Sequence, residues 1–415
     1  MKLHTLTSTF LITTIVISAN TENTQQPTAV QSVRNILGTY DTEIHTKGQL
    51  RAGFITLAQE GTERTNAYGL GGHIHFDTKR WNGMMLALSA YTVIDPAINQ
   101  NPLHTNPDFF DASNKSFALL SKAFIDGKWG NSEVKLGRQS LDTPFADSDD
   151  IRMMPNFFSA YTLKNTDIAH LTLQAGFIDK MAGWENGVDS SKFVDVAQVL
   201  GTDNTDGIYY ASAAYDIDNL SLSFWYYHYT DIANILYAEA GYAYTLFDNA
   251  ELTLGLQYSD TEETGAALLG TKNAHTFGVS AELAFPSLGI TLLGAYNKDN
   301  GKSGACDLSL GGGPYFTSME DQTVDAIGAK GSAWMAAVGY DLAALGAPHL
   351  NCGIAYGKFT ANEADIHYHT NETDIVVEYT PLDQLTITAA YANVNHKDDN
   401  GEDFDQFRLI VAYSF

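Results

Sequence analysis

The sequence predicts an all-β protein: a transmembrane antiparallel β-barrel of 18 strands with long external loops and short periplasmic turns. Three observations predict it. Segments of about ten residues alternate between apolar and polar positions, the connections between them alternate between short and long, and the chain ends on an aromatic residue within such a segment. The expected strands cover residues 47–57, 67–77, 82–94, 115–126, 132–141, 155–164, 169–179, 206–216, 219–230, 234–246, 250–259, 273–285, 288–297, 331–343, 349–360, 371–380, 384–394 and 405–415.

The alternation is clearest in three segments, whose sequences are ELTLGLQYSD (251–260), AYGLGGHIHF (67–76) and LTITAAYANV (385–394). Because successive side chains of a strand point to opposite faces, each segment has one apolar face. In the first, that face carries Leu252, Leu254, Leu256 and Tyr258. A soluble β-sandwich alternates in the same way, so the connections must separate the two classes.

The connections favour the barrel. Those from even to odd strands are short, for example DTKR after residue 76, NTDI after residue 164 and PLDQ after residue 380. Those from odd to even strands are mostly long and cover residues 95–114, 142–154, 180–205, 260–272 and 298–330, with 231–233 as a short exception. Outer-membrane barrels show this asymmetry between periplasmic turns and external loops, whereas a sandwich has no reason to.

Composition agrees with this class. Charged residues are only 17% of the chain, while 35 Gly, 22 Tyr and 21 Phe suit many strands bordered by aromatic belts. The formal net charge of -26 argues against nucleic-acid binding through phosphate contacts. No segment after the N-terminus offers about 18 consecutive apolar residues, so a mature chain that crosses a bilayer must do so as a closed barrel.

Both ends of the chain carry targeting signals. The N-terminal sequence MKLHTLTSTFLITTIVISA reads as a secretory signal peptide over residues 1–19, followed by a periplasmic segment over 20–46 and the barrel over 47–415. The C-terminal sequence QFRLIVAYSF resembles the sorting signature of bacterial outer-membrane barrels, with Phe415 last and Tyr413 two residues before it. The resemblance implies that the barrel assembly machinery reads Phe415.

The most distinctive stretch is LGRQSLDTPFADSDDIRMMPNFFSAYTL, residues 136–163. Pro144 and Pro155 bound a segment rich in charge, and proline fixes the backbone at each end, so we expect the loop near residues 142–155 to hold a defined course. Such an external loop can fold into the lumen, where charged side chains select among solutes.

This stretch resembles the OprD family of outer-membrane porins, which carry the same residues in the same order: Gly137, Gln139, Pro144, Asp150, Arg152, Pro155, and Phe157 or Phe158. The first strand, KGQLRAGFI, is also similar. The resemblance implies a monomeric or weakly trimeric passive channel of the Gram-negative outer membrane, surrounded by lipid and lipopolysaccharide. It implies uptake of small solutes, often carboxylates, along a ladder of basic residues opposite an acidic pocket, with no cofactor.

Strand parity predicts which side chains line the pore. Arg51, Arg408 and Lys135 alternate with apolar neighbours and should point inward. Arg138 has the outward phase, so it contributes only if a bulge shifts the register or if it lies above the lipid. The predicted pore-lining residues are Arg51, Lys135, Arg138, Asp147, Asp149, Asp150, Arg152, Arg408, His73 and His75, with no catalytic, cofactor or metal residue.

Several alternatives remain open. The chain has only seven arginines, and Glu251, Glu282 and Glu378 also have the inward phase, so a general diffusion porin of sixteen strands with cation preference is a rival. A barrel enzyme is another, although no Gly-x-Ser-x-Gly signature is present, and a secreted soluble adhesin or lectin is a third. Cys306 and Cys352 fall at opposite ends of the predicted barrel, so we expect two free thiols.

Overall fold

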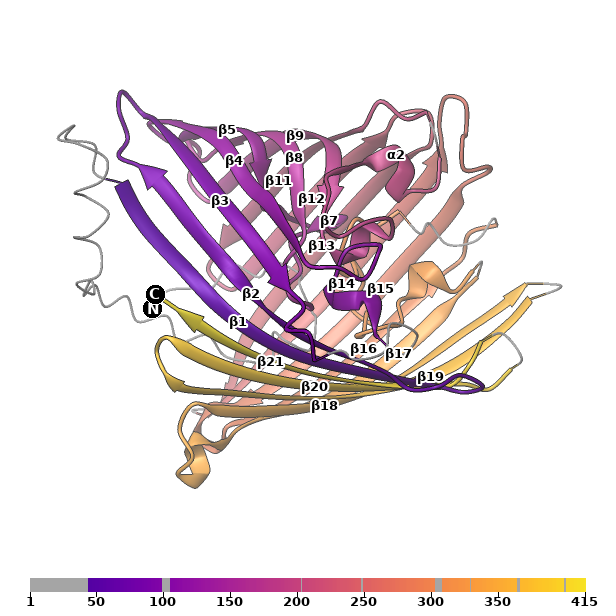
Figure 1. Cartoon of the computed structure of the whole chain (residues 1–415). Helices are drawn as coiled ribbons and strands as arrows, with labels where there is room; N and C mark the ends of the chain where they lie inside the picture. The colour runs from indigo at the N-terminus through magenta and orange to yellow at the C-terminus, as the bar shows by residue number, and fades with distance from the viewer. Residues whose placement is uncertain are drawn as a thin grey trace.

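The computed structural model describes residues 44–98, 105–202, 204–247, 249–302, 308–328, 330–363, 366–398 and 401–415. One antiparallel sheet of 19 strands dominates it, and because β10 (Val194–Asp195) is a two-residue strand, 18 strands form the wall. The first and last strands pair with each other from Gln49 opposite Ser414 to Gln59 opposite Phe404, which closes the sheet into a barrel (Figure 1). The prediction of 18 strands is confirmed, and the sixteen-stranded alternative is wrong.

The wall strands are β1 (Ile44–Gln59), β2 (Thr65–Thr78), β3 (Met84–Ile94), β4 (Phe117–Trp129), β5 (Ser132–Gln139), β8 (Phe157–Asn165), β9 (Leu171–Ala182), β11 (Ile208–Ile217), β12 (Leu220–Tyr229), β13 (Ala233–Phe247), β14 (Ala250–Glu263), β15 (Asn273–Phe285), β16 (Ile290–Asp299), β17 (Ser332–Asp341), β18 (Leu350–Glu363), β19 (Ile366–Leu382), β20 (Leu385–His396) and β21 (Phe404–Ser414). The connections contain β6 (Asp142–Thr143), β7 (Ala146–Asp147), β10, α2 (Val196–Val199) and the 3-10 turns η4 (Pro107–Phe109), η5 (Trp184–Asn186), η6 (Pro286–Leu288), η7 (Val324–Ala326) and η8 (Leu342–Leu345). No helix in these ranges is long and apolar enough to cross a membrane.

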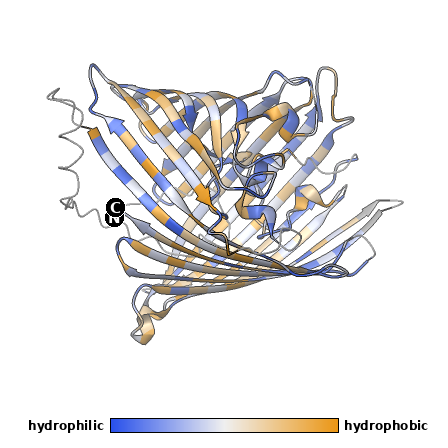
Figure 2. Ribbon diagram, in the orientation of Figure 1, coloured by the Kyte–Doolittle hydropathy of each residue, from blue (hydrophilic) through white to orange (hydrophobic). Residues whose placement is uncertain are grey.

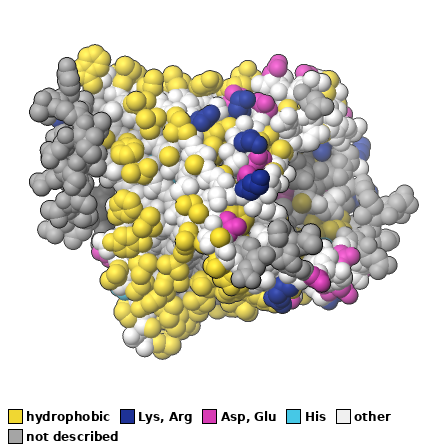
Figure 3. Space-filling view, viewed as in Figure 1, with side chains coloured by type: hydrophobic (Ala, Val, Ile, Leu, Met, Phe, Trp, Pro, Cys, Tyr) yellow, Lys and Arg dark blue, Asp and Glu magenta, His cyan; other side chains and the backbone are white. Residues whose placement is uncertain are grey.

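The outer face of the wall is apolar. Leu254, Leu256 and Tyr258 are about half exposed on β14, while Gln257 and Ser259 between and beyond them are buried inside. Apolar and polar bands alternate along the strands in Figure 2. Figure 3 shows hydrophobic side chains over much of the visible wall, with few charged ones among them on the left of the view. A wall of this kind is built to face lipid.

The connections keep the predicted asymmetry. Turns such as 130–131 between β4 and β5 and 218–219 between β11 and β12 have two residues, whereas 140–156 and 300–331 are long. One loop differs from expectation: β18 ends three residues later and β19 begins five residues earlier than predicted, because pairing continues without a break to Glu363 opposite Ile366. That hairpin therefore replaces the longer loop expected at 361–370.

Three predictions concern residues outside the described ranges. The signal peptide (1–19) and residues 20–43 of the N-terminal segment lie outside them, while residues 44–46 belong to β1 rather than to that segment. Cys306 also lies outside, so its separation from Cys352 remains a prediction, and Cys352 on β18 is a free thiol.

Apolar side chains from the long connections pack on the inner wall. The largest cluster joins Phe145 and Leu310 from two different connections to Tyr227 of β12 and Tyr237 of β13. A second places Tyr315, Phe316 and Met319 against β16 to β20. The connections therefore fill much of the lumen with ordered protein, which Figure 1 shows as the segments around β7 inside the barrel.

Candidate pore constriction

The proline loop (residues 140–156) folds into the barrel as a small hairpin. β6 and β7 pair across Pro144, and Thr143 supports the turn because its hydroxyl donates to the carbonyl of Ala146 at 2.9 Å. The ring of Phe145 at the tip is fully buried and meets Tyr227, Tyr237 and Tyr315 at centroid distances of 5.4, 5.9 and 6.5 Å. This aromatic anchor fixes the hairpin to the inner wall.

A second connection meets the proline loop inside the barrel. We call residues 308–328 the crossing loop. The amide of Leu310 donates to the carbonyl of Phe145 at 2.9 Å, and the amide of Asp147 donates back to the carbonyl of Leu310 at 3.2 Å. Backbone bonds of this kind position the two loops against each other independently of their side chains. No motif in either loop predicts this contact.

Arg51 on β1 binds the proline loop directly. Its Nη1 and Nη2 donate to the two carboxylate oxygens of Asp150 at 2.6 and 2.7 Å, and Nη1 also donates to the carbonyl of Arg152 at 3.1 Å. Gln49 accepts from Nη2 on the other side at 2.7 Å. The bidentate geometry holds the guanidinium, whose side chain is 5% exposed, whereas the Asp150 side chain remains 43% exposed.

Arg152 lies where four connections meet. Its Nε lies 3.3 Å from Asp108 in η4, its Nη1 lies 3.5 Å from Glu320 in the crossing loop, and its guanidinium stacks 4.0 Å from the ring centroid of Trp184 in η5. The side chain is only 3% exposed, and burial lowers the pKa of this guanidinium, as does Arg408. A planar cation between carboxylates and an aromatic face is a favourable arrangement for a buried arginine.

Arg408 on β21 completes the arginine cluster (Arg51, Arg152 and Arg408). Its Nη1 donates to Glu320 at 2.5 Å, so one carboxylate serves both Arg408 and Arg152. Burial alone would raise the pKa of Glu320, but the two arginines hold it below its ordinary value. Each arginine of this cluster is therefore bound to a loop carboxylate.

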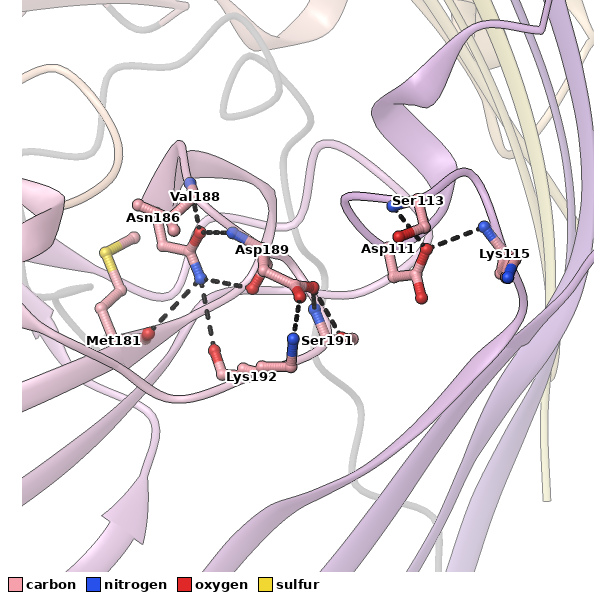
Figure 4. A network of polar contacts seen from close by, with 9 residues as sticks. All are labelled: Asp111, Ser113, Lys115, Met181, Asn186, Val188, Asp189, Ser191 and Lys192. Carbon is pink, nitrogen blue, oxygen red and sulfur yellow. Dashed lines mark hydrogen bonds and ion pairs between the residues drawn. The ribbon is translucent and has the colours of Figure 1, made fainter. Parts of the chain in front are cut away.

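The turn that carries Trp184 and Glu185 is built around Asn186 (Figure 4). The amide nitrogen of that side chain donates to the carbonyl of Asp189 at 2.8 Å, and its oxygen accepts from the amides of Val188 and Asp189, both at 2.9 Å. Asp189 in turn bonds Ser191 and Lys192. The turn is rigid before any solute arrives, because buried donors and acceptors are paired within it.

An acidic pocket lies beside the proline loop. Glu185 accepts from the side chain of Asn156 and from the amide of Gly312, the latter at 3.0 Å. Burial raises the pKa of Asp149 well above its ordinary value, and the carboxylates of Glu185 and Asp147 raise it further. Burial also raises the pKa of Glu185. Two buried carboxyls of like charge hold a proton between them more readily than either would alone.

A basic row crosses the inner wall over β1 to β4, the part of the wall to which Arg51 binds the proline loop. Pairing places Lys47 of β1 beside His75 of β2, His75 beside Ser89 of β3, and Ser89 beside Lys122 of β4. Within the described residues neither lysine forms an ion pair, although Lys122 lies 5.6 Å from the ring centroid of Phe157. His75 lies 3.3 Å from Asp77, and His73 packs on Tyr91 at 4.8 Å.

Neither lysine of this row was predicted. By parity Lys122 shares the outward phase of Leu120, but Ser121 is an extra residue in the β3–β4 pairing, and this bulge turns Lys122 inward. Glu320, Glu185 and Trp184 were also missed, since long connections have no periodicity from which a side-chain direction can be read.

The two remaining predicted residues lie on β5. Lys135 forms an ion pair with Glu133 at 2.9 Å. Arg138 donates to the carbonyl of Leu120 at 3.0 Å and stacks 4.4 Å from the ring centroid of Phe193 in the connection after β9. Gly137 before it has φ of +125°, a conformation that disturbs the regular alternation. Nowhere among the described residues do three His, Cys, Asp or Glu side chains form a group that could hold a metal ion.

Comparison with known proteins gives the family. The sequence model for outer membrane porins of the OprD family matches residues 112–415, which is well over half of the chain. No curated protein sequence matches the chain.

Solved structures show the same fold at low identity. Pseudomonas aeruginosa OccK9 (OpdG) superposes with a TM-score of 0.80 at 21% identity, covering 90% of this chain and 98% of its own. P. aeruginosa OpdK with vanillate superposes with a TM-score of 0.76 at 21% identity, covering 89% of this chain and 98% of its own. A BenF-like porin from Pseudomonas fluorescens Pf-5 superposes with a TM-score of 0.79 at 18% identity, covering 90% of this chain and 98% of its own. With its closed 18-stranded wall and its matched sequence, the chain belongs to the OprD family of outer membrane porins and forms a passive channel for small solutes in the bacterial outer membrane.

Proposed function

We propose that this porin takes up small solutes that carry a carboxylate and that the basic row guides them. The observation that carries the proposal is Lys122, whose ammonium group lies on the inner wall without a carboxylate partner among the described residues. A half-buried cation without a counter-ion attracts an anion, and the neighbouring Lys47 extends the attraction along the wall. The P. aeruginosa relative OpdK has been crystallised with vanillate, which is a carboxylate.

The arginine cluster has a different role in this proposal. Arg51 and Arg408 are bound to Asp150 and Glu320, so they hold the proline loop and the crossing loop in the lumen rather than offering free charge. The two loops form the constriction, and the half-exposed carboxylate of Asp150 lies at its edge. Asp147, Asp149 and Glu185 supply the negative side, which would favour a solute that carries a positive group as well as its carboxylate.

Lys122→Gln should weaken anion preference. Removing the free ammonium group lowers the local positive potential, so the anion-to-cation permeability ratio should fall about twofold. The measurement is the reversal potential of the purified protein in planar bilayers under a gradient of KCl and then of potassium benzoate. Lys128→Gln, on the same strand but exposed at its periplasmic end, is the matched control and should leave the ratio unchanged. An unaltered reversal potential in Lys122→Gln would contradict the proposal.

A cation-preferring pore is the second candidate, and one observation favours it: every arginine of the cluster is neutralised by a carboxylate, and further acids surround them. The reversal-potential recordings described above distinguish the cation-preferring pore from the anion-preferring one. A wild-type reversal potential of the cation-selective sign that moves toward zero in Asp150→Asn would support this candidate instead.

We further propose that the assembly machinery of the outer membrane recognises Phe415, that lipopolysaccharide surrounds the external half of the wall, and that the protein works as a monomer or homotrimer. Phe415 is 49% exposed, while its backbone exchanges two hydrogen bonds of 2.9 Å with Gly48. The ring is thus free for recognition although the backbone is fixed.

Phe415→Ala should lower the amount of protein in the outer membrane severalfold without weakening the folded barrel. The substitution keeps both backbone bonds to Gly48, so the thermal midpoint of detergent-refolded protein should change little, because exposed substitutions usually cost less than about 0.5 kcal/mol. Quantitative blotting of outer-membrane fractions measures the amount of protein in the membrane, and thermal melting measures the stability of the folded barrel. Equal membrane levels in variant and wild type would argue against recognition of the ring.

A further inference from the structure

The ends of the crossing loop are held mainly by apolar packing and neutral hydrogen bonds, although the amide of Gly312 also donates to Glu185 at 3.0 Å. Leu308 and Leu310 are buried against the tyrosines of β12 and β13, and Val324 and Ile327 pack toward β16 to β18. The carbonyl of Pro314 accepts from the side chain of Gln257 at 2.8 Å. Apart from the bond to Glu185, these contacts neither gain nor lose charge between acidic and neutral pH, so the apolar packing should keep the ends in place over that range.

The middle of the same loop is held by carboxylates. Glu372 on β19 accepts from the amides of Asp321 and Gln322, both at 2.8 Å, and Asp374 accepts from the amide of Glu320 at 3.2 Å. The amides of three consecutive loop residues therefore donate hydrogen bonds to two acids on the inward face of β19. Both acids are fully buried, with 0% and 1% exposure. The hydroxyl of Tyr368 adds a bond to the side chain of Gln322.

Acids outnumber cations at this place. Glu320, Asp321, Glu372 and Asp374 face only Arg152 and Arg408, and both arginines are directed to Glu320. Glu372 and Asp374 lie two residues apart on the same inward face of β19 and are both buried, so their carboxylates repel each other unless one of them carries a proton. Asp321 Oδ2 and Asp374 Oδ1 are buried without a donor in the described part of the chain.

The flanking elements supply no compensating charge. Glu372 pairs across the sheet with Gly357 of β18 and Val394 of β20, and Asp374 pairs with Ala355 and Ala392. The other titratable groups near the site include Asp108, Asp149 and Glu185 from other connections, which are all acidic. The hydroxyl of Tyr368 faces Glu372, and His396 of β20 lies 5.9 Å from the Tyr368 ring and 2.8 Å from Thr370. Protons are thus the means by which this cluster can reduce its repulsion.

We propose that residues 320–322 form a proton-dependent latch: with protons held among Asp321, Glu372 and Asp374 the crossing loop stays bound to β19 and narrows the lumen, and loss of these protons releases the middle of the loop. The released loop remains tethered at both apolar ends, so the change is a swing of its central residues and the wall strands stay in place. Proton-controlled conductance goes beyond solute selectivity and requires only that the protein be a channel.

The direction in which the latch responds to pH follows from how tightly each state binds protons. Burial, together with Glu320, raises the pKa of Asp321 from 3.8 to about 6, so the latched state binds a proton more tightly than a loop released into water. The latch is therefore strongest below the ordinary pKa and weakens as the pH rises through the raised one. Between these two values the equilibrium toward release should shift by up to roughly a hundredfold, the factor that about two pKa units give one group.

Single-channel recording of the full-length protein in planar bilayers, from about pH 4 to about pH 8, tests the latch. The wild type should spend more time in its higher-conductance state as the pH rises. Asp321→Asn removes one titrating group, so its high-conductance fraction should stay low further toward neutral pH. Glu372→Gln replaces an acceptor by a donor that faces an amide, and it should open often even at acidic pH. Tyr368→Phe loses the bond to Gln322 without any change of charge and should open moderately more at every pH.

Glu378→Gln is the matched control, because Glu378 lies on the same strand and face as Glu372 without a hydrogen bond to the crossing loop. It should keep the wild-type pH profile. Heat-modifiable migration in gels verifies that each variant is a folded barrel. If Glu372→Gln does not fold, Tyr368→Phe still tests the latch without a change of charge. A wild-type profile in Asp321→Asn would overturn the proposal, as would low opening at acidic pH in both Glu372→Gln and Tyr368→Phe. Because these readings use conductance rather than reversal potential, they stand or fall separately from carboxylate selectivity.

Discussion

Glu320→Gln should increase single-channel conductance markedly and make the current noisy, because it removes the carboxylate shared by Arg152 and Arg408. Both guanidiniums would stay buried and lose the carboxylate that they share, while Arg152 would keep Asp108 at 3.3 Å and Arg408 would keep Gln406 at 3.5 Å. Breaking a buried ion pair by removing one partner costs about 3–5 kcal/mol. The interstrand ladders do not involve Glu320, so we expect most of this cost to be relieved by displacement of the two loops rather than by unfolding of the barrel.

Two further variants make this test specific. Glu320→Gln combined with Arg408→Gln removes the uncompensated charge together with its partner, so the double variant should be closer to wild type than the sum of the single variants predicts. Glu282→Gln, an inward acid on β15 without an ion pair among the described residues, should leave the conductance unchanged. Wild-type conductance and wild-type melting in Glu320→Gln would show that the shared carboxylate does not position the loops.

Leu256→Arg should destabilise the folded barrel by about 2–4 kcal/mol, because the side chain lies on the lipid face near the middle of β14. Leu256 is 61% exposed, among the most exposed leucines of the wall. Denaturant titration of the protein folded into lipid vesicles measures the free energy of unfolding. Glu282→Arg introduces the same side chain on the neighbouring strand but toward the lumen, and it should cost less than about 0.5 kcal/mol. Equal losses in the two variants would contradict the assignment of the faces.

The alternation of apolar residues determined more of this structure than any motif did. Leu252, Leu254, Leu256 and Tyr258 could be assigned to one face from the sequence, because a strand has a period of two and lipid tolerates no charge on that face. The same rule gave Arg51 and Arg408 their inward direction. Applied to Lys122, it would give the wrong direction, since one inserted residue, Ser121, reverses the phase and leaves no mark in the pattern.

The contacts of the loop side chains could not be predicted from strand periodicity. The two prolines indicated that residues 142–155 keep a fixed course, but nothing in the sequence told which wall Phe145 would meet or that Leu310 would pair with it. Glu320 stands in a stretch rich in glycine and acid, where neither period nor spacing indicates a partner. Its two arginines come from positions 152 and 408, and such contacts between distant parts of a chain follow only from the closed fold.

The pairing of β1 with β21 also constrains how the protein is made. The strand that begins the barrel cannot find its second neighbour until the final residues have left the ribosome and crossed the inner membrane, because Gln49 pairs with Ser414. Until then β1 presents an unpaired edge of amides and carbonyls beside an apolar face, a combination that promotes aggregation. We therefore expect the edge of β1 to need shielding in the periplasm until β21 pairs with it, for a time that grows with the length of chain between the two strands.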